Sequence, residues 1–285
     1  MKKVLVVGAA GMLGEPVARK LKSEGWAVRA LVRNVEEARR KLGADFDIVQ
    51  GDAEDAASVA RALEGCAVCH VSLMSPPGDP ELELRATKAI ARAAGTAKLE
   101  RLGYLSGGTS VEANRWFPNV RLKLEAEEAV RSSGVPFTVF RPSWFMESLS
   151  RLVRDGQAAL LGPQVLPLHW VSAEDYARMV ATAYAKPEAA GKALWIWGPE
   201  AMTMEQVINQ YRTLVAPSTK VMKVPFFMAS LMAFVTGNKE MKSFIPFMRF
   251  TAEHPEPGNP DEANQLLGAP TITFQQWCQA RAAKA

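Results

Sequence analysis

The sequence predicts a doubly wound α/β fold of the Rossmann class, with a parallel sheet in the strand order 3-2-1-4-5-6. Near the N-terminus, an apolar run breaks into a glycine-rich turn and leads into a segment with helical spacing. Short apolar runs then alternate with helix-length segments through the first half of the chain. The 285 residues suffice for one large domain, or for one large domain with a small appendage.

The elements of the first half follow from this alternation. Apolar runs of strand length occur at 3–8, 26–32, 46–50, 66–72, 100–106 and 136–141. Segments with helical spacing lie between them, at 12–24, 35–43, 55–64, 79–95 and 119–133. Apolar runs joined through helices are typical of a parallel sheet that helices cover on both faces. Ligands of such a sheet bind at the carboxyl ends of its strands.

The glycine turn has the composition of a pyrophosphate site. Its glycines are spaced three apart, and a predicted helix with Pro16 near its start follows them. Glycines let the backbone approach a phosphate, and the N–H groups and dipole of a helix N-terminus favour negative charge. We therefore predict a dinucleotide site, although a tight turn without a ligand is the alternative. The predicted contacts are Gly8, Ala10, Gly11, Met12, Leu13 and Gly14.

After Arg141 the pattern is less regular. Short strands are predicted at 165–171 and 193–197, and helices at 174–185, 205–214, 226–235, 241–250 and 274–283. We expect a dinucleotide-binding domain at 1–150, with its sheet extended by segments within 165–200, and a small helical substrate or cap region at 201–285. The segment 225–250 is rich in Met and Phe. Helix packing, an apolar substrate lining, and docking on a membrane or partner remain open for it.

The composition excludes several classes of protein. The chain is 48% hydrophobic and 22% charged, which is ordinary for a globular protein. The net charge of +4 is mild, and no basic tract with interleaved aromatic residues indicates nucleic-acid binding. No apolar run approaches the ~20 residues that span a bilayer, and the N-terminus passes directly into the first predicted strand. We expect a cytoplasmic protein without a transmembrane segment, and its oligomeric state is unknown.

The cysteines and histidines form no metal or disulfide pattern. Cys66 and Cys69 fall on a predicted strand, where residues three apart point to opposite faces, so buried structural thiols are favoured over a redox pair. The three histidines lack metal-ligand spacing. His70 lies near a strand end, where a structural role is favoured and a cofactor contact is the alternative.

The residues after the second strand predict which dinucleotide binds. Many such sites place a carboxylate here against the ribose 2′-hydroxyl of NAD, but this chain has Arg33 and Asn34. A carboxylate would repel the 2′-phosphate of NADP, whereas an arginine can bind it. We predict NADP as the cofactor, with NADPH preferred over NADH; a solvated surface arginine is the alternative. Asp52, after the third strand, is predicted either to bind the adenine amino group or to cap a helix.

Three other basic residues near this position, Arg39, Arg40 and Lys41, are weaker candidates for the phosphate. Arg40 and Lys41 follow Glu36 and Glu37 by four residues in a predicted helix. Side chains with this spacing lie next to each other and can form ion pairs. We therefore expect these carboxylates to neutralise Arg40 and Lys41.

Several segments, in order, resemble the NmrA-like, atypical branch of the short-chain dehydrogenase/reductase superfamily. They are the glycine turn, 31–33, 51–52, 140–147 and 175–177, and the resemblance covers about residues 1–215. It implies that the backbone just after Arg141 lies beside the nicotinamide and that the next residues enter the substrate pocket. It thus implies cofactor contacts for Pro142 and Trp144, and a substrate pocket lined by Trp144, Phe145 and Met146.

The family's usual catalytic tyrosine is missing. Most catalytic members of the superfamily carry Tyr-x-x-x-Lys, in which the phenol supplies a proton, and the matching residues here are Asn119 and Lys123. A carboxamide cannot transfer a proton near neutral pH. Lys123 is therefore predicted to bind the nicotinamide ribose or to act as the acid, with a solvated lysine as the alternative. Ser106 matches the region of the family's hydroxyl residue, or it belongs to a turn. Lys123, Asn119 and Ser106 are the catalytic candidates.

Three functions follow from the resemblance, and the sequence does not decide among them. The first is an NADPH-dependent reductase of a small apolar enone, quinone or imine substrate. The second is a non-catalytic sensor that reports the redox state of NADP(H) to a protein partner. The third is an accessory subunit of a respiratory complex, in which the nucleotide is structural.

Overall fold

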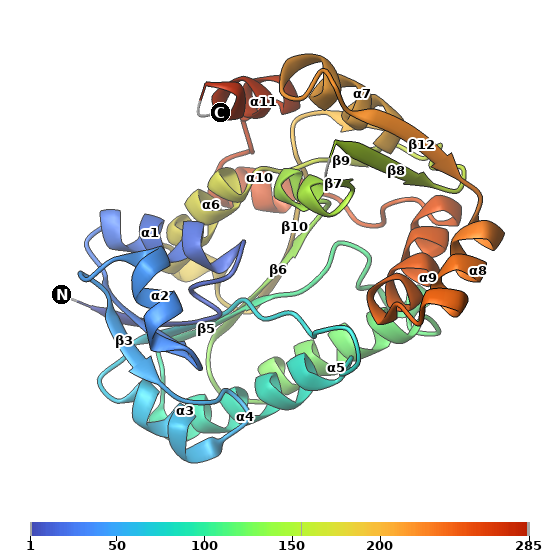
Figure 1. The fold of residues 1–285 in the computed structure, drawn as a ribbon. Coiled ribbons are helices and arrows are strands. Elements are labelled where there is room, and N and C mark those ends of the chain that lie inside the picture. Colours follow the sequence, from blue (N-terminus) through green and yellow to red (C-terminus); the bar gives the residue numbers. More distant parts are fainter. Residues whose placement is uncertain (1, 155, 284–285) are drawn as a thin grey trace. The chain divides into compact units, whose positions relative to one another are not determined.

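The computed structural model describes residues 2–154 and 156–283 (Figure 1). The chain folds into two compact units. Unit 1 consists of Met1–Pro142, Ala173–Ile196 and Asn259–Ala269. Unit 2 consists of Ser143–Ser172, Trp197–Gly258 and Pro270–Ala285. The chain therefore passes between the units several times. The division at 1–150 and 201–285 stays a prediction.

Unit 1 contains the predicted Rossmann sheet. Seven parallel strands pair in the order β10-β6-β5-β4-β1-β2-β3, which confirms the order 3-2-1-4-5-6 and adds β10 beside β6. The strands are β1 (Lys3–Val7), β2 (Ala27–Val32), β3 (Asp47–Gln50), β4 (Val68–Val71), β5 (Arg101–Leu105), β6 (Phe137–Pro142) and β10 (Lys192–Ile196). Strand β10 comes from within the segment 165–200 that was expected to extend the sheet.

Helices cover both faces of this sheet (Figure 1). Helix α4 packs against α3 and α5, and α6 packs against α1 and α10. The helices are α1 (Gly14–Ser23), α2 (Val35–Leu42), α3 (Ala56–Leu63), α4 (Leu82–Ala97), α5 (Pro118–Arg131), α6 (Ala173–Ala185) and α10 (Asp261–Leu267). Because both faces are covered, the central strands are buried on both sides, and their sequences are continuously apolar rather than alternating.

His70, Cys66 and Cys69 have structural roles in the core of unit 1. The His70 Nδ1 lies 2.6 Å from the Tyr184 hydroxyl, its Nε2 lies 3.4 Å from the Tyr176 hydroxyl, and burial lowers the pKa of the imidazole to about 3. His70 is thus a neutral core residue, as the favoured alternative expected. Cys66 and Cys69 are free thiols, and burial raises the pKa of both.

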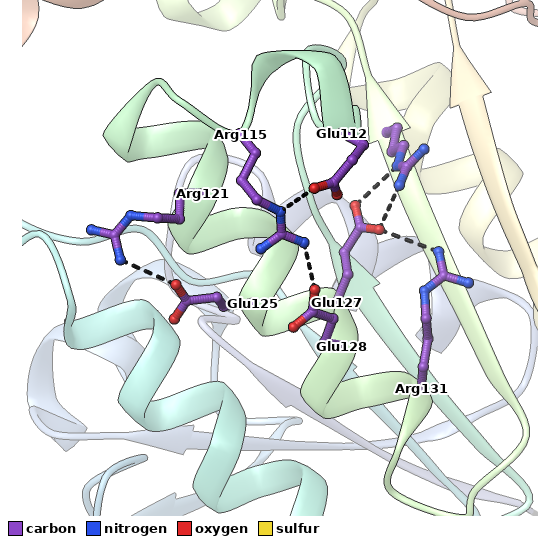
Figure 2. A network of polar contacts seen from close by, with 8 residues as sticks. Glu112, Arg115, Arg121, Glu125, Glu127, Glu128 and Arg131 are labelled. Carbon is purple, nitrogen blue, oxygen red and sulfur yellow. Dashed lines mark hydrogen bonds and ion pairs between the residues drawn. The ribbon is translucent and has the colours of Figure 1, made fainter.

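A buried ion pair joins α5 to the sheet. The Glu127 carboxylate accepts hydrogen bonds from Arg141 Nε at 2.9 Å and Nη2 at 2.6 Å, and both side chains are less than a tenth exposed. Glu127 also accepts from the Ser106 hydroxyl at 2.7 Å. It lies 3.3 Å from Arg131 (Figure 2). The Arg141 guanidinium lies 4.6 Å from the ring centroid of Trp195 in β10. One carboxylate therefore links α5, β6 and the residue that follows β5.

Unit 2 combines helices with two small sheets. Strand β8 (Gln157–Leu161) pairs with β7 (Val153–Arg154) and β12 (Lys220–Val224), and β9 (Leu168–His169) pairs with β11 (Ala201–Met202). The helices are α7 (Met204–Leu214), α8 (Phe226–Thr236), α9 (Lys239–Glu253) and α11 (Phe274–Ala282). Trp170, Phe274 and Leu149 belong to its buried core. The helices of the C-terminal part confirm a mainly helical C-terminal region, whereas β7, β8 and β9 come from 143–172, before that region.

Some elements of the second half were not predicted. Strands β8 and β12 pair in parallel although Gln157 and Lys220 are far apart in sequence, so no local signal joins them. Strand β12 has Lys220 and Lys223 among three apolar residues without alternation, and it is mostly exposed, which makes it a weak strand pattern. Helix α10 follows three prolines that indicated a break, and it begins directly after Pro260.

We predict that Glu127→Ala lowers the free energy of unfolding by about 3–5 kcal/mol, because it leaves the buried Arg141 guanidinium without its carboxylate. Glu125→Ala on the same helix is the matched control. Glu125 pairs with the half-exposed Arg121 (Figure 2), so its loss should cost less than about 1 kcal/mol. Urea denaturation of the wild type and both variants measures the difference. Equal losses for the two variants would show that the Glu127 pair adds no more than a surface pair.

Candidate functional site

The glycine turn lies directly against the end of β4. Gly8 has a φ of +88°, and a Cβ there would lie 2.1 Å from the Ser72 carbonyl oxygen. A Cβ on Gly14 would lie 2.0 Å from the Gly8 carbonyl oxygen. The Gly11 N–H donates to that same oxygen at 2.9 Å. Packing alone therefore requires glycine at positions 8 and 14, which keeps the turn close to the sheet.

The outer side of the turn is open. Of the described neighbours, a Cβ on Gly11 would meet only the Gly8 carbonyl oxygen within 4 Å, at 3.1 Å. Helix α1 begins after Leu13 without a side-chain cap from any described residue, and Met12 is 40% exposed. Backbone N–H groups at this helix start can therefore bind an anion. Packing favours glycine less strongly at position 11 than at 8 and 14, and a phosphate close to the backbone would add a second reason for it.

The end of β2 lies beside this turn. Val7 of β1 is paired with Leu31 of β2, so Gly8 and Arg33 both follow adjacent strand ends. Arg33 is exposed, and its guanidinium has no hydrogen bond or ion pair with residues 2–154 or 156–283. Asn34 caps α2, because its side-chain oxygen accepts from Glu37 N–H at 3.0 Å. The side-chain oxygen of Asn34 is thus used by the helix cap, whereas the whole guanidinium of Arg33 is available for a ligand.

A second cation reaches the turn from α2. Lys41 Nζ lies 3.3 Å from the Ala10 carbonyl oxygen and 2.9 Å from Glu37 Oε1. The hydrogen bond from Lys41 lowers the pKa of the Glu37 carboxyl, as the expected pairing requires. Because of that pairing, Lys41 is predicted from the sequence to be a weaker candidate for binding the phosphate. The contact with Ala10, more than thirty positions away, has no local sequence signal.

Asp52 is exposed at the end of β3. Its carboxylate accepts a hydrogen bond from Glu54 N–H at 2.9 Å within the local turn. Asp55 caps helix α3 instead, accepting from Ala57 N–H and from Ser58 N–H. Asp55 therefore caps α3, and Asp52 does not have the capping role that was one of its two predicted alternatives. The adenine contact stays a prediction.

The three catalytic candidates have separate surroundings. Lys123 Nζ donates to Glu83 Oε1 at 2.6 Å and to the Leu105 carbonyl at 3.2 Å. Ser106 is buried, and its hydroxyl donates to Glu127. Asn119 is exposed in the first turn of α5. Lys123 thus lies one helical turn from Asn119, as expected. Lys123 and Ser106, however, are hydrogen-bonded to different carboxylates, Glu83 and Glu127.

Glu83 is a site residue that the sequence did not indicate. The Tyr104 hydroxyl donates to the same Glu83 oxygen at 2.7 Å, and burial, reinforced by Glu83, raises the pKa of Tyr104 well above its ordinary value. Tyr104 is therefore a neutral hydrogen-bond donor and does not act as an acid at neutral pH. An ammonium group has three N–H bonds, and Lys123 uses two of them here. The third can hold a ligand hydroxyl.

The predicted substrate-pocket residues Trp144, Phe145 and Met146 lie in unit 2. The cofactor candidate Pro142 lies in unit 1, at the end of β6. Trp144 stacks on Phe247, with ring centroids 5.7 Å apart and an interplanar angle of 23°. Phe145 is 8% exposed, and Met146 is 1% exposed within the core. Of these three, Trp144 is thus the most accessible to a ligand. The pocket role of Phe145 and Met146 stays a prediction.

Unit 2 also contains a histidine–carboxylate pair that the sequence did not suggest. His169 Nδ1 lies 2.8 Å from Glu256 Oε2, and the imidazole stacks on Trp197 with centroids 4.4 Å apart. Glu256 also accepts from the His169 backbone N–H at 2.9 Å and from the Ser143 hydroxyl. The carboxylate orients the ring, so Nε2 is the nitrogen that can exchange a proton with a ligand. The partners are 87 positions apart, and no local pattern reveals them.

The NmrA-like family model matches residues 1–266. The chain belongs to the NmrA-like family. It is 34% identical over 220 residues to a (4-alkanoyl-5-oxo-2,5-dihydrofuran-3-yl)methyl phosphate reductase of Streptomyces griseus, covering 75% of this chain and 74% of that protein. It is 27% identical over 230 residues to the photosystem II assembly factor Ycf39 of Cyanophora paradoxa, covering 78% of this chain and 71% of that protein. NmrA-like relatives thus include both a reductase and an assembly factor.

The fold of this NmrA-like protein matches that of a solved reductase. The triphenylmethane reductase of Citrobacter sp., in complex with NADP(H), aligns with a TM-score of 0.78 over 98% of this chain and 99% of that chain. The two sequences are 19% identical, so the likeness concerns the fold. It shows that this chain shares the overall fold of that enzyme.

Proposed function

We propose that this protein is an NADPH-dependent reductase of a small apolar enone, quinone or imine, and that quinones suit its site best. The observation that carries the proposal is the Arg33 guanidinium, unpaired within the described ranges, beside an open glycine turn. A guanidinium at this position can pair with the 2′-phosphate that distinguishes NADP from NAD. The furanone phosphate reductase relative and the NADP(H) in the similar Citrobacter enzyme support it.

The residues of unit 1 fit the parts of this cofactor. In the proposal, the backbone N–H groups around Gly11 hold the pyrophosphate, because packing leaves that side of the turn open. Arg33 binds the 2′-phosphate, and Asp52 accepts from the adenine amino group. The remaining N–H bond of Lys123 holds a hydroxyl of the nicotinamide ribose. NADPH, when bound, supplies the hydride.

The absence of a suitable acid among the three catalytic candidates limits the substrate class. Asn119 has no acidic proton, the Ser106 hydroxyl donates to Glu127, and Lys123 is paired with Glu83. A hydride added to a simple ketone gives an alkoxide, whose conjugate acid is about as weak as water and which therefore needs a proton donor. A hydride added to a quinone carbonyl system gives a phenolate, with a conjugate acid near pKa ~10 as in tyrosine, and water can protonate it. Quinones are therefore the favoured acceptors.

The same observation favours a second candidate function. A protein that binds NADPH with this site but transfers no hydride would be a redox sensor or an assembly protein. The photosystem II assembly factor among its relatives supports this alternative. Turnover distinguishes the two candidates, because binding alone is common to both.

We predict that the protein oxidises NADPH with apolar quinones at least ~10²-fold faster than with simple ketones, since the latter require general acid catalysis. The assay follows NADPH absorbance with matched concentrations of each acceptor. Binding of NADPH without oxidation by any quinone, enone or imine would reject the reductase and favour the sensor.

A lysine variant in the same assay tests the source of the proton. If Lys123 only holds the ribose, Lys123→Ala should raise the KM for NADPH by about 10- to 100-fold and leave kcat largely intact. Arg121→Ala, on the exposed face of the same helix, is the matched control and should change neither value. A fall in kcat of ~10²–10⁴ at saturating NADPH would instead identify Lys123 as the acid.

For the cofactor, we predict that Arg33→Ala weakens NADPH binding by about 10- to 100-fold and leaves NADH binding nearly unchanged. The lost contact is a charge-assisted pair with a phosphate that NADH lacks, at about 1.5–3 kcal/mol. Calorimetric titration of both nucleotides against wild type and variant measures this, with Arg92→Ala, at an exposed arginine of α4, as the control. Equal losses for NADPH and NADH would mean that Arg33 does not bind the 2′-phosphate.

A further inference from the structure

Helix α8 (Phe226–Thr236) exposes a continuous apolar face. Its inner side packs Ala229 and Ala233 into the core of unit 2, and both are almost completely buried. Its outer side is formed by large hydrophobic residues that are 46–75% exposed. These are Phe227, Met228, Leu231, Met232, Phe234 and Val235. A helix that is apolar all round is usually buried on all sides, so this outer face requires a partner.

The chain around this face is basic. Residues 205–253 contain six Lys or Arg and three Glu, one of which, Glu205, pairs with Lys223 at 2.7 Å, whereas the net charge of the entire chain is +4. Lys220 lies in the strand that leads into α8, and Lys239 and Lys242 lie in the first turn of the next helix, α9. All three are exposed, and Lys242 Nζ lies 5.9 Å from the ring centroid of Phe234. Positive charge therefore lies on the strand before α8 and directly after α8, at the start of α9.

We propose that α8 docks this protein on the surface of an anionic lipid membrane. The apolar side chains would enter the boundary between headgroups and acyl chains, while the lysines contact the anionic headgroups. Helix α8 has 11 residues and a length of about 16 Å, which is too short to span a bilayer. None of the helices in the described ranges is long and apolar enough to cross a membrane. The helix therefore lies in the plane of the membrane surface.

Charge favours a lipid surface over a second copy of the chain as the occupant. A two-fold contact between copies would pair each α8 with its own equivalent, because such an interface uses the same patch on both molecules. The lysines that precede and follow one helix would then approach the lysines that precede and follow the other. Like charges brought together destabilise that contact, whereas anionic headgroups neutralise them.

This inference is independent of the proposed function. It concerns residues of unit 2, whereas the proposed cofactor residues Gly11, Arg33 and Lys123 belong to unit 1. Three alternatives were open for the segment 225–250, and we infer membrane docking for the outer face of α8. The packing of Ala229 and Ala233 accounts for the inner face.

The test is sedimentation of the full chain with lipid vesicles. We expect the protein to bind vesicles of phosphatidylcholine and phosphatidylglycerol in equal parts at least ~10-fold more than vesicles of phosphatidylcholine alone, and to be released by high salt. Phe234→Glu should reduce binding by ~10-fold or more, because it places a charge in the apolar face. Val165→Glu, at a comparably exposed apolar position of unit 2, is the matched control and should bind like the wild type.

A second variant tests the basic residues separately. Lys239→Gln combined with Lys242→Gln should lower binding to the anionic vesicles severalfold without changing the weak binding to neutral ones. Circular dichroism and thermal melting check that every variant is folded. No binding of the wild type to anionic vesicles overturns the proposal, as does equal binding of Phe234→Glu and Val165→Glu. A wild-type dimer in gel filtration that only Phe234→Glu converts to a monomer would assign the face to a second copy and also overturn it.

Discussion

The turn at 8–14 can hold a ligand because its backbone lies closer to β4 than any side chain would allow. A Cβ on Gly8 or Gly14 would lie about 2 Å from a carbonyl oxygen, so the turn and the start of α1 depend on these two glycines. Gly11 is different, because its outer side is open and only its backbone is engaged. The turn is therefore rigid toward the sheet and accessible on the side where a pyrophosphate would bind. The proposed roles of Arg33 and Lys123 depend on a cofactor held there.

Buried carboxylates then determine which polar groups remain for chemistry. Glu127 engages Arg141 and the Ser106 hydroxyl, and Glu83 engages Lys123. Each pairing satisfies a polar group that burial would otherwise penalise. The proposed nucleotide site therefore has few free proton donors, because Ser106 and Lys123 are engaged by these carboxylates and the Asn119 carboxamide has no acidic proton. This is why the proposed reaction uses an acceptor that water can protonate, and why a sensor is the competing function.

The sequence could predict the sheet of unit 1 because parallel strands buried on both faces are continuous apolar runs, as at 3–8 and 66–72. It could also predict the glycine turn and Arg33, since these follow strand ends within one βαβ unit. It could not predict the pair of Glu83 with Lys123 or of His169 with Glu256, because their partners are brought together only by the fold. Strands β8 and β12 were missed for the same reason.

The central claim is that the turn at 8–14, together with the end of β2, binds NADPH. Hydrogen–deuterium exchange with mass spectrometry, measured with and without saturating NADPH, tests it directly on the full chain. The account predicts slower exchange of the backbone N–H groups in the peptides that contain 8–14 and 33–41, because a bound nucleotide engages the first and orders the second. NADPH binding that protects other peptides and leaves 8–14 unchanged would contradict it.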